Sequence, residues 1–338
     1  MSFDIWNRRY TGSKYKLADW IFDIIDKNCK GNSFCDIFAG TGVMAQRAIT
    51  KMDSVIINDF LYSNEIIYKA FFLKEEYDEN KILEYKNLFQ SLRGLKLKAN
   101  YVSKNFGNKF FSKNDALIIG KIREIIEEAK DLTEKERAIL IASLLYSADK
   151  VANTVGHYDA YIKGKTINDQ FIFELINPYK SNADIKIYRQ DANLLAKTLK
   201  CDIVYIDPPY NSRQYSRFYH VLENIATWKK PKLYGEALKP EPENMSEYCR
   251  CSAVEAFSNL INDLTCKYIV VSYNNTYDSK SSSSKNKMTL ESIKEILSSK
   301  GKLLCFEKAH QFFNAGRTKF DNHKELIFLV EVNNDEDR

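Results

Sequence analysis

Near its start, this 338-residue chain has the pattern of a strand, a glycine turn, a helix and a second strand, which limits its possible folds. Residues 33–38 form a short apolar run that ends at Ala39-Gly40-Thr41-Gly42. Apolar residues at helical spacing follow over 43–50, and a second strand pattern covers 54–58. A βαβ unit of this kind joins parallel strands, so the sequence predicts an α/β fold with a parallel sheet.

The periodicity of the chain changes twice after this unit. Residues 61–180 have mainly helical patterns. Alternation of strands and helices then resumes, with strand patterns at 185–188, 201–206, 268–272, 302–308 and 324–332. The last two patterns predict an antiparallel hairpin appended to a mostly parallel sheet. We therefore expect a main domain of residues 1–60 and 181–338 and an inserted, mainly helical lobe of residues 61–180.

Composition narrows the class of protein. The chain is 44% hydrophobic and 28% charged, has no run of 18 apolar residues and no secretory signal, so we expect a soluble cytoplasmic protein. Its seven cysteines are scattered through apolar segments, which is typical of reduced thiols. Cys249 and Cys251 form a close pair without a second pair or a histidine cluster nearby, so we assign no metal site.

A stretch without acidic residues extends from Tyr85 to Asn114. Cations that neutralise phosphates and rings that stack on bases suit nucleic acid, although a solvated basic face over ordinary core aromatics has the same composition. The candidate DNA-contacting lysines are Lys96, Lys98, Lys104 and Lys109, and the candidate stacking rings are Phe89, Tyr101, Phe106, Phe110 and Phe111.

The glycine turn has the spacing of a cofactor-binding loop. Residues 40–45, Gly-Thr-Gly-Val-Met-Ala, fit G-x-G-x-x-A between a strand and a helix, and Asp59 stands at the end of the next strand. Glycines let the backbone approach a ligand, and a carboxylate at that place accepts hydrogen bonds from ribose hydroxyls. The pattern fits any adenosine-containing cofactor, including that of a nicotinamide dehydrogenase, and it also fits a plain turn between a strand and a helix.

The most informative motif for chemistry is Asp207-Pro208-Pro209-Tyr210, directly after the apolar run 201–206. That place is the carboxyl end of a strand, where open α/β sheets bind ligands. The Asp207 carboxylate and the Pro208 carbonyl are two acceptors suited to the N–H bonds of an aromatic amine, whose lone pair is otherwise delocalised into its ring. Consecutive prolines stiffen the loop, and Tyr210 offers a face on which a flipped base can stack. A plain strand-ending turn is the competing interpretation.

Together these motifs resemble those of the N6-adenine DNA methyltransferases of the Dam-like D12 class, which includes many methylases of restriction-modification systems. Tyr10-Thr11-Gly12-Ser13-Lys14 is similar to the N-terminal motif of that family, 34–42 to its cofactor motif and Asn58-Asp59 to its second acidic strand end, and 207–210 matches its catalytic motif without a departure. The resemblance implies a Rossmann-like class I methyltransferase fold. In that fold residues 1–60 and 181–338 form the catalytic domain, and 61–180 form the target-recognition lobe.

The resemblance also implies S-adenosyl-L-methionine as the cofactor and double-stranded DNA as the substrate. Asp207 would face both the cofactor and the target amine in a catalytic loop of Asp207, Pro208, Pro209 and Tyr210. Asp191 stands where the family holds the adenine of the cofactor, but a cap on the helix that begins at Ala192 explains it equally. Lys14 has a competing interpretation as a surface lysine. The implied cofactor-binding residues are Tyr10, Lys14, Asp36, Phe38, Gly40, Gly42, Asp59, Asp191 and Asp207.

Two arginines, Arg213 and Arg217, follow the catalytic loop. Their guanidinium groups suit DNA phosphates or guanine edges beside the extruded base, and pairing with Glu223 and Asp207 is the alternative. A Ser/Lys-rich stretch over 279–287 fits either a DNA-gripping loop or a plain linker.

The sequence therefore predicts a site-specific DNA adenine-N6 methyltransferase, with a cognate restriction endonuclease as a candidate partner. Cytosine-N4 methylation uses an almost identical site, commonly with Ser in place of Asp207, and is the alternative base. A DNA-binding module that binds the cofactor without turnover is an alternative of another class. Cytosine-C5 methylation is disfavoured, because its cysteine nucleophile usually follows a proline and the chain contains no Pro-Cys pair.

Overall fold

The computed structural model describes residues 2–275, 286–309 and 324–333. The chain forms two compact units, which we call the helical unit and the sheet unit. The helical unit comprises Met1–Ser13, Leu61–Ser181 and Tyr215–Asn244. The sheet unit comprises Lys14–Phe60, Asn182–Gln214 and Met245–Arg338.

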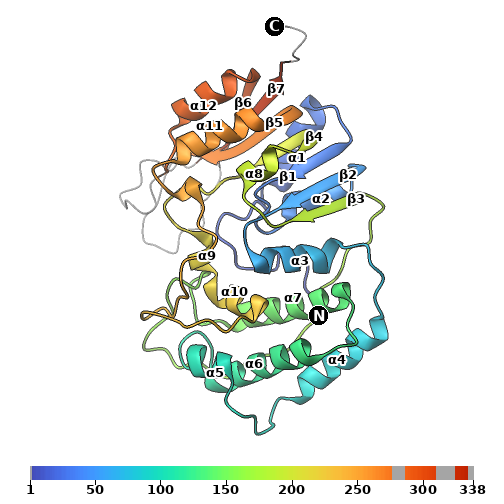
Figure 1. Cartoon of the computed structure of the whole chain (residues 1–338), viewed down its shortest axis with the longest axis vertical. Helices are drawn as coiled ribbons and strands as arrows, with labels where there is room; N and C mark the ends of the chain where they lie inside the picture. Colours follow the sequence, from blue (N-terminus) through green and yellow to red (C-terminus); the bar gives the residue numbers. More distant parts are fainter. Residues whose placement is uncertain (1, 276–285, 310–323, 334–338) are drawn as a thin grey trace. The chain divides into compact units, whose positions relative to one another are not determined.

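The sheet unit contains a seven-stranded sheet with the order β3-β2-β1-β4-β5-β7-β6 (Figure 1). All pairs from β3 to β5 are parallel, and β7 pairs antiparallel with both β5 and β6. This strand order confirms the predicted α/β fold and its Rossmann-like methyltransferase class. The strands are β1 (Ser33–Asp36), β2 (Ser54–Asn58), β3 (Asp184–Tyr188), β4 (Lys200–Ile206), β5 (Thr265–Asn274), β6 (Gly301–Ala309) and β7 (Lys324–Val332).

The last strand of the chain, β7, is the inner member of the C-terminal antiparallel pair. Its residues 326–330 are apolar and buried, whereas β6 has exposed residues along most of its length. A continuous apolar run is stable only where both faces of the strand are covered. The predicted hairpin is confirmed, and burial explains why β7 rather than β6 joins the parallel strands.

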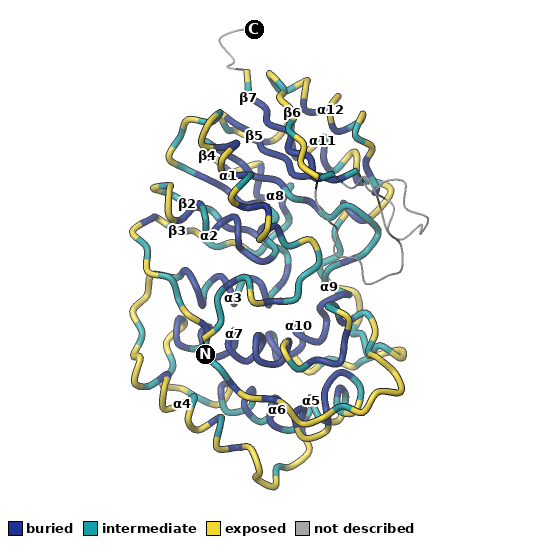
Figure 2. The backbone as a smooth tube through the Cα atoms, turned by 180° about the vertical axis from the view of Figure 1, so that it is seen from behind, coloured by how far each residue is buried: buried dark blue, intermediate teal, exposed yellow. Residues whose placement is uncertain are grey.

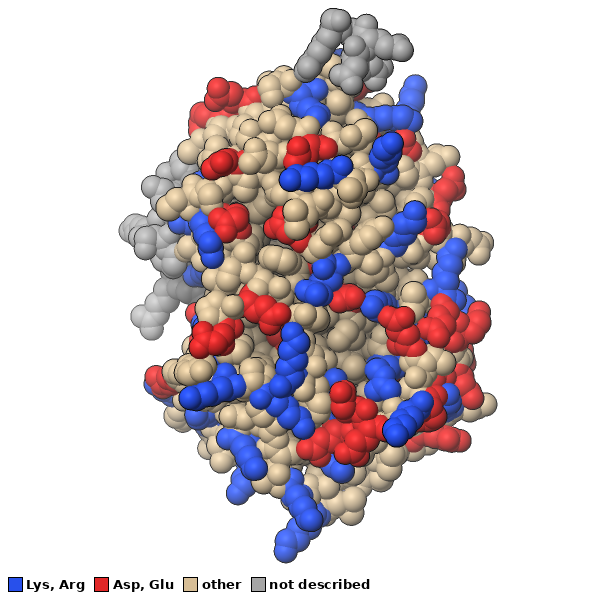
Figure 3. Space-filling view, in the orientation of Figure 1, with Lys and Arg blue, Asp and Glu red and all other residues tan. Residues whose placement is uncertain are grey.

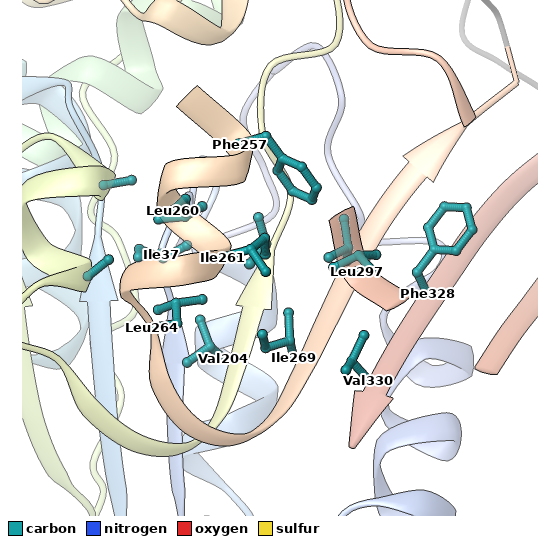
Figure 4. Packing of buried hydrophobic residues seen from close by; sticks show 14 of the residues in the cluster. Ile37, Val204, Phe257, Leu260, Ile261, Leu264, Ile269, Leu297, Phe328 and Val330 are labelled. Atoms are coloured by element: carbon teal, nitrogen blue, oxygen red, sulfur yellow. The ribbon is translucent and has the colours of Figure 1, made fainter. Parts of the chain in front are cut away.

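Helices cover both faces of this sheet. On one face lie α1 (Ala18–Asn28) and α2 (Val43–Ile49), and on the other lie α8 (Ala192–Ala196), α11 (Ala253–Asp263) and α12 (Leu290–Ser298). Figure 4 shows Leu260, Ile261 and Leu264 of α11 packed over Val204 and Ile269 of the sheet. Apolar residues that recur at i, i+1 and i+4 give α11 this buried stripe.

The helical unit is built around α7 (Glu134–Val151), which is buried along nearly its whole length (Figure 2). Thr133 and Glu136 form a capping box that satisfies the first backbone N–H groups of α7. The surrounding helices are α3 (Tyr62–Phe72), α4 (Glu79–Ser91), α5 (Tyr101–Phe106), α6 (Lys113–Glu128), α9 (Tyr215–Phe218) and α10 (His220–Thr227).

The helical unit takes in three chain segments, where the sequence pattern predicts the single segment 61–180. Packing accounts for the two additional segments. Tyr10 stacks on Tyr219 at a ring-centre distance of 4.7 Å, and α10 packs against α3 and α7. These contacts join residues 1–13 and 215–244 to the helical core.

Among the described residues, no helix is both long and apolar enough to cross a membrane. All seven cysteines are free thiols. Within the same described part of the chain, no three His, Cys, Asp or Glu side chains lie so that they could hold a metal ion.

Candidate active site

An ion pair between Lys14 and Asp207 lies at the carboxyl end of β4. Asp207 is the first residue after that strand, and Lys14 precedes α1. The Lys14 Nζ atom lies 2.8 Å from Asp207 Oδ2 and 3.0 Å from Oδ1. The Lys14 side chain is 7% exposed, so its interpretation as a surface lysine is wrong.

A second carboxylate, that of Glu325 in β7, faces the same ammonium group. Glu325 Oε1 lies 3.4 Å from Lys14 Nζ and accepts a hydrogen bond of 2.8 Å from the hydroxyl of Ser272 in β5. Because β7 runs antiparallel to β5, the start of β7 lies at the carboxyl end of β5. We call this set the lysine cluster: Lys14, Asp207, Tyr210, Ser272 and Glu325.

Ser272 and Glu325 belong to none of the sequence motifs. The signal that could have found Glu325 is its place directly before five buried apolar residues, 326–330. A long apolar run predicts a covered strand, and an acid at the start of a covered strand needs a partner. No motif reveals that this partner is Lys14, because the two residues lie at opposite ends of the chain.

The electrostatics of the lysine cluster follow from burial and from its two carboxylates. Burial by itself lowers the pKa of Lys14, but the carboxylates of Asp207 and Glu325 raise that pKa above its ordinary value. Burial raises the pKa of Asp207, Lys14 opposes this rise, and Glu325 adds to it. The ammonium group therefore stays charged, and Asp207 takes up a proton more readily than an exposed aspartate does.

Tyr210 ends the loop of residues 207–210 and belongs to the lysine cluster. Its hydroxyl donates a hydrogen bond to Asp207 Oδ1 and accepts one of 2.9 Å from Lys14 Nζ. Its ring packs edge-on against Tyr273, with the ring centres 4.6 Å apart. The backbone N–H of Lys287 donates to the Tyr210 carbonyl oxygen at 2.7 Å. Hydroxyl, ring and backbone of Tyr210 are thus all held.

The glycine turn joins β1 to α2 in a conformation that favours glycine. Gly40 and Gly42 have φ angles of 53° and 79°, and Gly42 is the N-cap of α2. Asp59 Oδ2 accepts a hydrogen bond of 2.9 Å from the Gly40 N–H. The Asn58 side chain donates to the backbone carbonyls that follow β1 and β3, at 3.0 and 3.1 Å. The ends of β1, β2 and β3 are therefore tied together around the turn.

The Asp36 carboxyl group, at the end of β1, is buried and has no hydrogen bond of ordinary geometry from a described residue. Burial raises the pKa of Asp36 well above its usual range, and Asp207 raises it further, while the nearby backbone N–H of Ala45 lowers it. Phe38 follows two residues later and packs edge-on against Tyr248. A buried acid without a partner is costly, and a cation brought beside it would remove that cost.

Asp191 caps α8, as one of its two sequence interpretations predicts. Its Oδ1 atom accepts hydrogen bonds from the backbone N–H groups of Asn193 and Leu194, at 2.9 and 3.3 Å. This geometry accounts for an aspartate before Ala192 without any ligand. The side chain is only partly buried, so the cap does not prevent a further contact.

Tyr10 belongs to an aromatic group in the helical unit. It stacks on Tyr219 with an angle of 7° between the rings, and the Arg8 guanidinium lies 5.0 Å from its ring centre. The Tyr10 hydroxyl accepts a hydrogen bond of 3.4 Å from the Asn64 side chain. Tyr10 is therefore a rigidly held ring within its own unit.

The two arginines after the catalytic loop lie in different units. Arg213, in the sheet unit, donates its backbone N–H to the side chain of Asn211, and the Arg217 guanidinium donates to the carbonyl of Pro240 in the helical unit. Glu223 accepts hydrogen bonds from the first two N–H groups of α3, at 3.0 and 2.7 Å. Of the Ser/Lys-rich stretch, residues 279–285 lie outside the described residues.

In the acid-free stretch 85–114, most of the aromatic side chains lie in the core of the helical unit. Phe89, Phe106, Phe110 and Phe111 are fully or almost fully buried, so the expectation that these four rings stack on bases is wrong. Phe89 of α4 packs edge-on against Phe173, and Phe106 of α5 packs edge-on against Phe110 in the segment that leads to α6. Lys96, Lys98 and Lys104 are exposed and Lys109 is partly exposed. Figure 3 shows Lys and Arg side chains over α5 and the loop before it.

Comparisons with known proteins find similar sequences over nearly the whole chain. The model of the D12 class N6 adenine-specific DNA methyltransferases matches residues 10–301. The type II methyltransferases M.NlaIII of Neisseria lactamica and M.CviAII of Paramecium bursaria Chlorella virus 1 are 32% and 33% identical to this chain. The alignments cover 93% and 96% of this chain and 95% and 98% of those relatives. A solved structure from Thermoplasma acidophilum aligns over 93% of this chain and 88% of its own, with 10% identity and a TM-score of 0.34.

Proposed function

Because the chain belongs to the D12 class of N6 adenine-specific DNA methyltransferases, we propose that it methylates an adenine flipped out of duplex DNA, with S-adenosylmethionine as the methyl donor. The observation that carries the proposal is the Asp207 carboxylate at the carboxyl end of β4, held there by the Lys14 ammonium group. This is the edge at which an open α/β sheet binds its ligands.

The residues around the glycine turn fit S-adenosylmethionine. That cofactor carries an ammonium group, a sulfonium group and two ribose hydroxyls. Among the described residues the buried Asp36 carboxyl group has no hydrogen bond of ordinary geometry, which suits one of the cations, and Asp59 suits the ribose hydroxyls. Gly40 and Gly42 have positive φ angles that let the backbone approach the ligand. We assign the remaining contacts to Tyr10, Lys14, Phe38, Asp191 and Asp207.

The chemistry at the target amine belongs to the catalytic loop. Asp207 and the Pro208 carbonyl accept hydrogen bonds from the amine and draw its nitrogen toward tetrahedral geometry, which frees the lone pair for bonding. When bound, S-adenosylmethionine would supply an electrophilic methyl group. The amine nitrogen would then form a bond to the methyl carbon as the carbon–sulfur bond breaks, with the electron pair of the broken bond left on sulfur. Asp207 stabilises the positive charge on that nitrogen until one proton passes to water. No covalent intermediate with the protein is needed, because the chain only positions and polarises.

Recognition of DNA is assigned to exposed cations and to the helical unit. We place Arg213 and Arg217 beside the extruded nucleotide, and we assign backbone contacts to Lys96, Lys98, Lys104 and Lys109. In this scheme residues 61–180 read the target sequence. Because M.NlaIII and M.CviAII are named type II methyltransferases, we also propose that the chain protects host DNA from a cognate restriction endonuclease.

The test is to incubate the protein with S-adenosylmethionine labelled in its methyl group and with mixed-sequence duplex DNA, and then to digest the DNA to nucleosides. Label in N6-methyldeoxyadenosine is the expected result. Label in N4-methyldeoxycytidine would reverse the base while keeping the mechanism. Cofactor binding without any labelled nucleoside would favour the DNA-binding module that lacks turnover.

A further inference from the structure

Glu325 is a buried carboxylate at the centre of the lysine cluster, outside the motifs that identify the family. Its side chain is 5% exposed, and its Oε1 atom lies 3.4 Å from Lys14 Nζ and 2.8 Å from Ser272 Oγ. The Tyr210 hydroxyl lies 3.5 Å from the same oxygen. Burying a second carboxylate beside Asp207 costs more free energy than burying an apolar side chain of similar size. Stability alone therefore does not account for Glu325.

We propose that Glu325 is a positioning residue for methyl transfer, which shares the Lys14 ammonium group with Asp207 and leaves the lysine cluster with a net negative charge. Two carboxylates and one ammonium group carry a net charge of −1. With Asp207 as the sole carboxylate, the ion pair would be neutral and Lys14 would occupy much of the accepting capacity of Asp207. This inference rests on the proposed function of Asp207 as the acceptor for the target amine.

The geometry supports this division of the ammonium group. Lys14 Nζ contacts both oxygens of Asp207 and one oxygen of Glu325. The positive charge of the ammonium group therefore compensates part of the negative charge of each carboxylate. The buried hydroxyl of Ser272 fixes Glu325 in this place. Methyl transfer brings positive charge onto the amine nitrogen, and a fixed negative charge in a site with little water stabilises that charge strongly.

Several ionisable groups face the Asp207 carboxylate from the elements packed around it. They are Lys14 from the segment before α1, Asp36 from β1, Tyr205 from β4, Tyr210 from the catalytic loop and Glu325 from β7. Asp207 must be ionised to accept from the amine, so its protonation sets the acid limb of the rate. Glu325 raises the pKa of Asp207. Removing the Glu325 charge therefore lowers that pKa and moves the acid limb to lower pH.

The experiment measures the single-turnover rate of methyl transfer against pH for the whole chain and for E325Q, with S-adenosylmethionine and DNA both saturating. We expect the E325Q rate on the alkaline plateau to fall about tenfold or more and its acid limb to move to lower pH. The Kd for S-adenosylmethionine should change less than about twofold, because Glu325 is not itself assigned to the cofactor and its charge acts on the positive charge that develops in the transition state. E331Q is the matched control, because Glu331 lies exposed in the same strand.

The possible outcomes distinguish a positioning role of Glu325 from a structural one. An E325Q rate within about twofold of the parent, or a lower rate with an unmoved acid limb, overturns the inference and leaves Glu325 a structural role. If E325Q does not fold, S272A decides: a rate loss at unchanged cofactor affinity supports the inference, and an unchanged rate overturns it. Absence of labelled N6-methyldeoxyadenosine with the parent chain would instead refute the proposed function itself.

Discussion

At the scale of the residue, the proposed methyl transfer depends on buried ionisable groups whose protonation states are set by their neighbours. Lys14 lowers the pKa of Asp207, whereas burial and Glu325 raise it. K14M removes the opposing effect, so the pKa of Asp207 rises and the acid limb of methyl transfer moves to higher pH, opposite to the shift expected for E325Q. We expect the plateau rate to fall about a hundredfold. Single-turnover rates against pH measure both effects.

The control for this prediction is K27M, because Lys27 is exposed in the last turn of α1. Thermal unfolding of K14M verifies that the fold persists without the buried ammonium group. An acid limb that stays in place or moves to lower pH in folded K14M would contradict the assignment of that limb to Asp207.

Asp36 leads to a second prediction at this scale. Its pKa is raised well above the usual range, so it must release a proton before it can pair with a cationic group of the cofactor. Affinity for S-adenosylmethionine should therefore rise with pH up to the raised pKa of Asp36 and level off above it. D36N should bind about tenfold or more weakly on that plateau and lose this pH dependence. Calorimetric titration across pH measures both, and a pH dependence that persists in D36N would refute the assignment.

At the scale of the element, apolar patterns predict most strands and helices, because runs and periodicities report burial directly. The strand patterns at 54–58 and 324–332 coincide with β2 and β7. The pairing of strands that are far apart in the sequence is harder to predict. The pattern of β7 predicts a covered strand, but it does not predict which two strands lie beside it. The same limit applies to α5, where composition does not reveal that Phe106 faces the core and Lys104 faces solvent.

Two substitutions of Asp191, the N-cap of α8, distinguish its role as a cap from a role in binding the cofactor. Serine caps a helix about as well as aspartate, and alanine does not. D191A should lower the free energy of unfolding by about 1 kcal/mol, while D191S should keep it within a few tenths. If Asp191 also contacts the cofactor, D191S should weaken S-adenosylmethionine binding severalfold despite its intact stability. Unchanged affinity in D191S would restrict Asp191 to the cap.

At the scale of the whole molecule, motifs predict the class of enzyme, while the charge distribution and the two units come only from the structure. Asp207 and Lys14 belong to recognisable motifs, so they could be predicted to serve one site. Glu325 and Ser272 could not, because they meet Lys14 only through the antiparallel pairing of β5 with β7. The four buried phenylalanines of 85–114 are an example of the opposite error. The composition of that stretch suits DNA binding, but these side chains lie in the core and cannot contact DNA.

The proposed basic surface makes a prediction for DNA binding. Replacing Lys96, Lys98, Lys104 and Lys109 with Gln should weaken binding uniformly across sequences, and should reduce the slope of log affinity against log salt by about 0.9 for each phosphate that a lysine no longer neutralises. The control replaces exposed lysines of the sheet unit, Lys27, Lys197, Lys200 and Lys302, with the same loss of charge. Equal affinities and slopes in the two variants would exclude a specific role for the first set.

The most direct test of the account is the single-turnover methyl-transfer rate of D207A at saturating S-adenosylmethionine and DNA, with unfolding and DNA binding measured on the same preparation. We predict that the variant folds and binds DNA, while its rate of N6-adenine methylation falls about a thousandfold or more, because the acceptor that draws the amine nitrogen toward tetrahedral geometry is lost. A folded D207A that methylates adenine at nearly the parent rate would contradict the central role of Asp207.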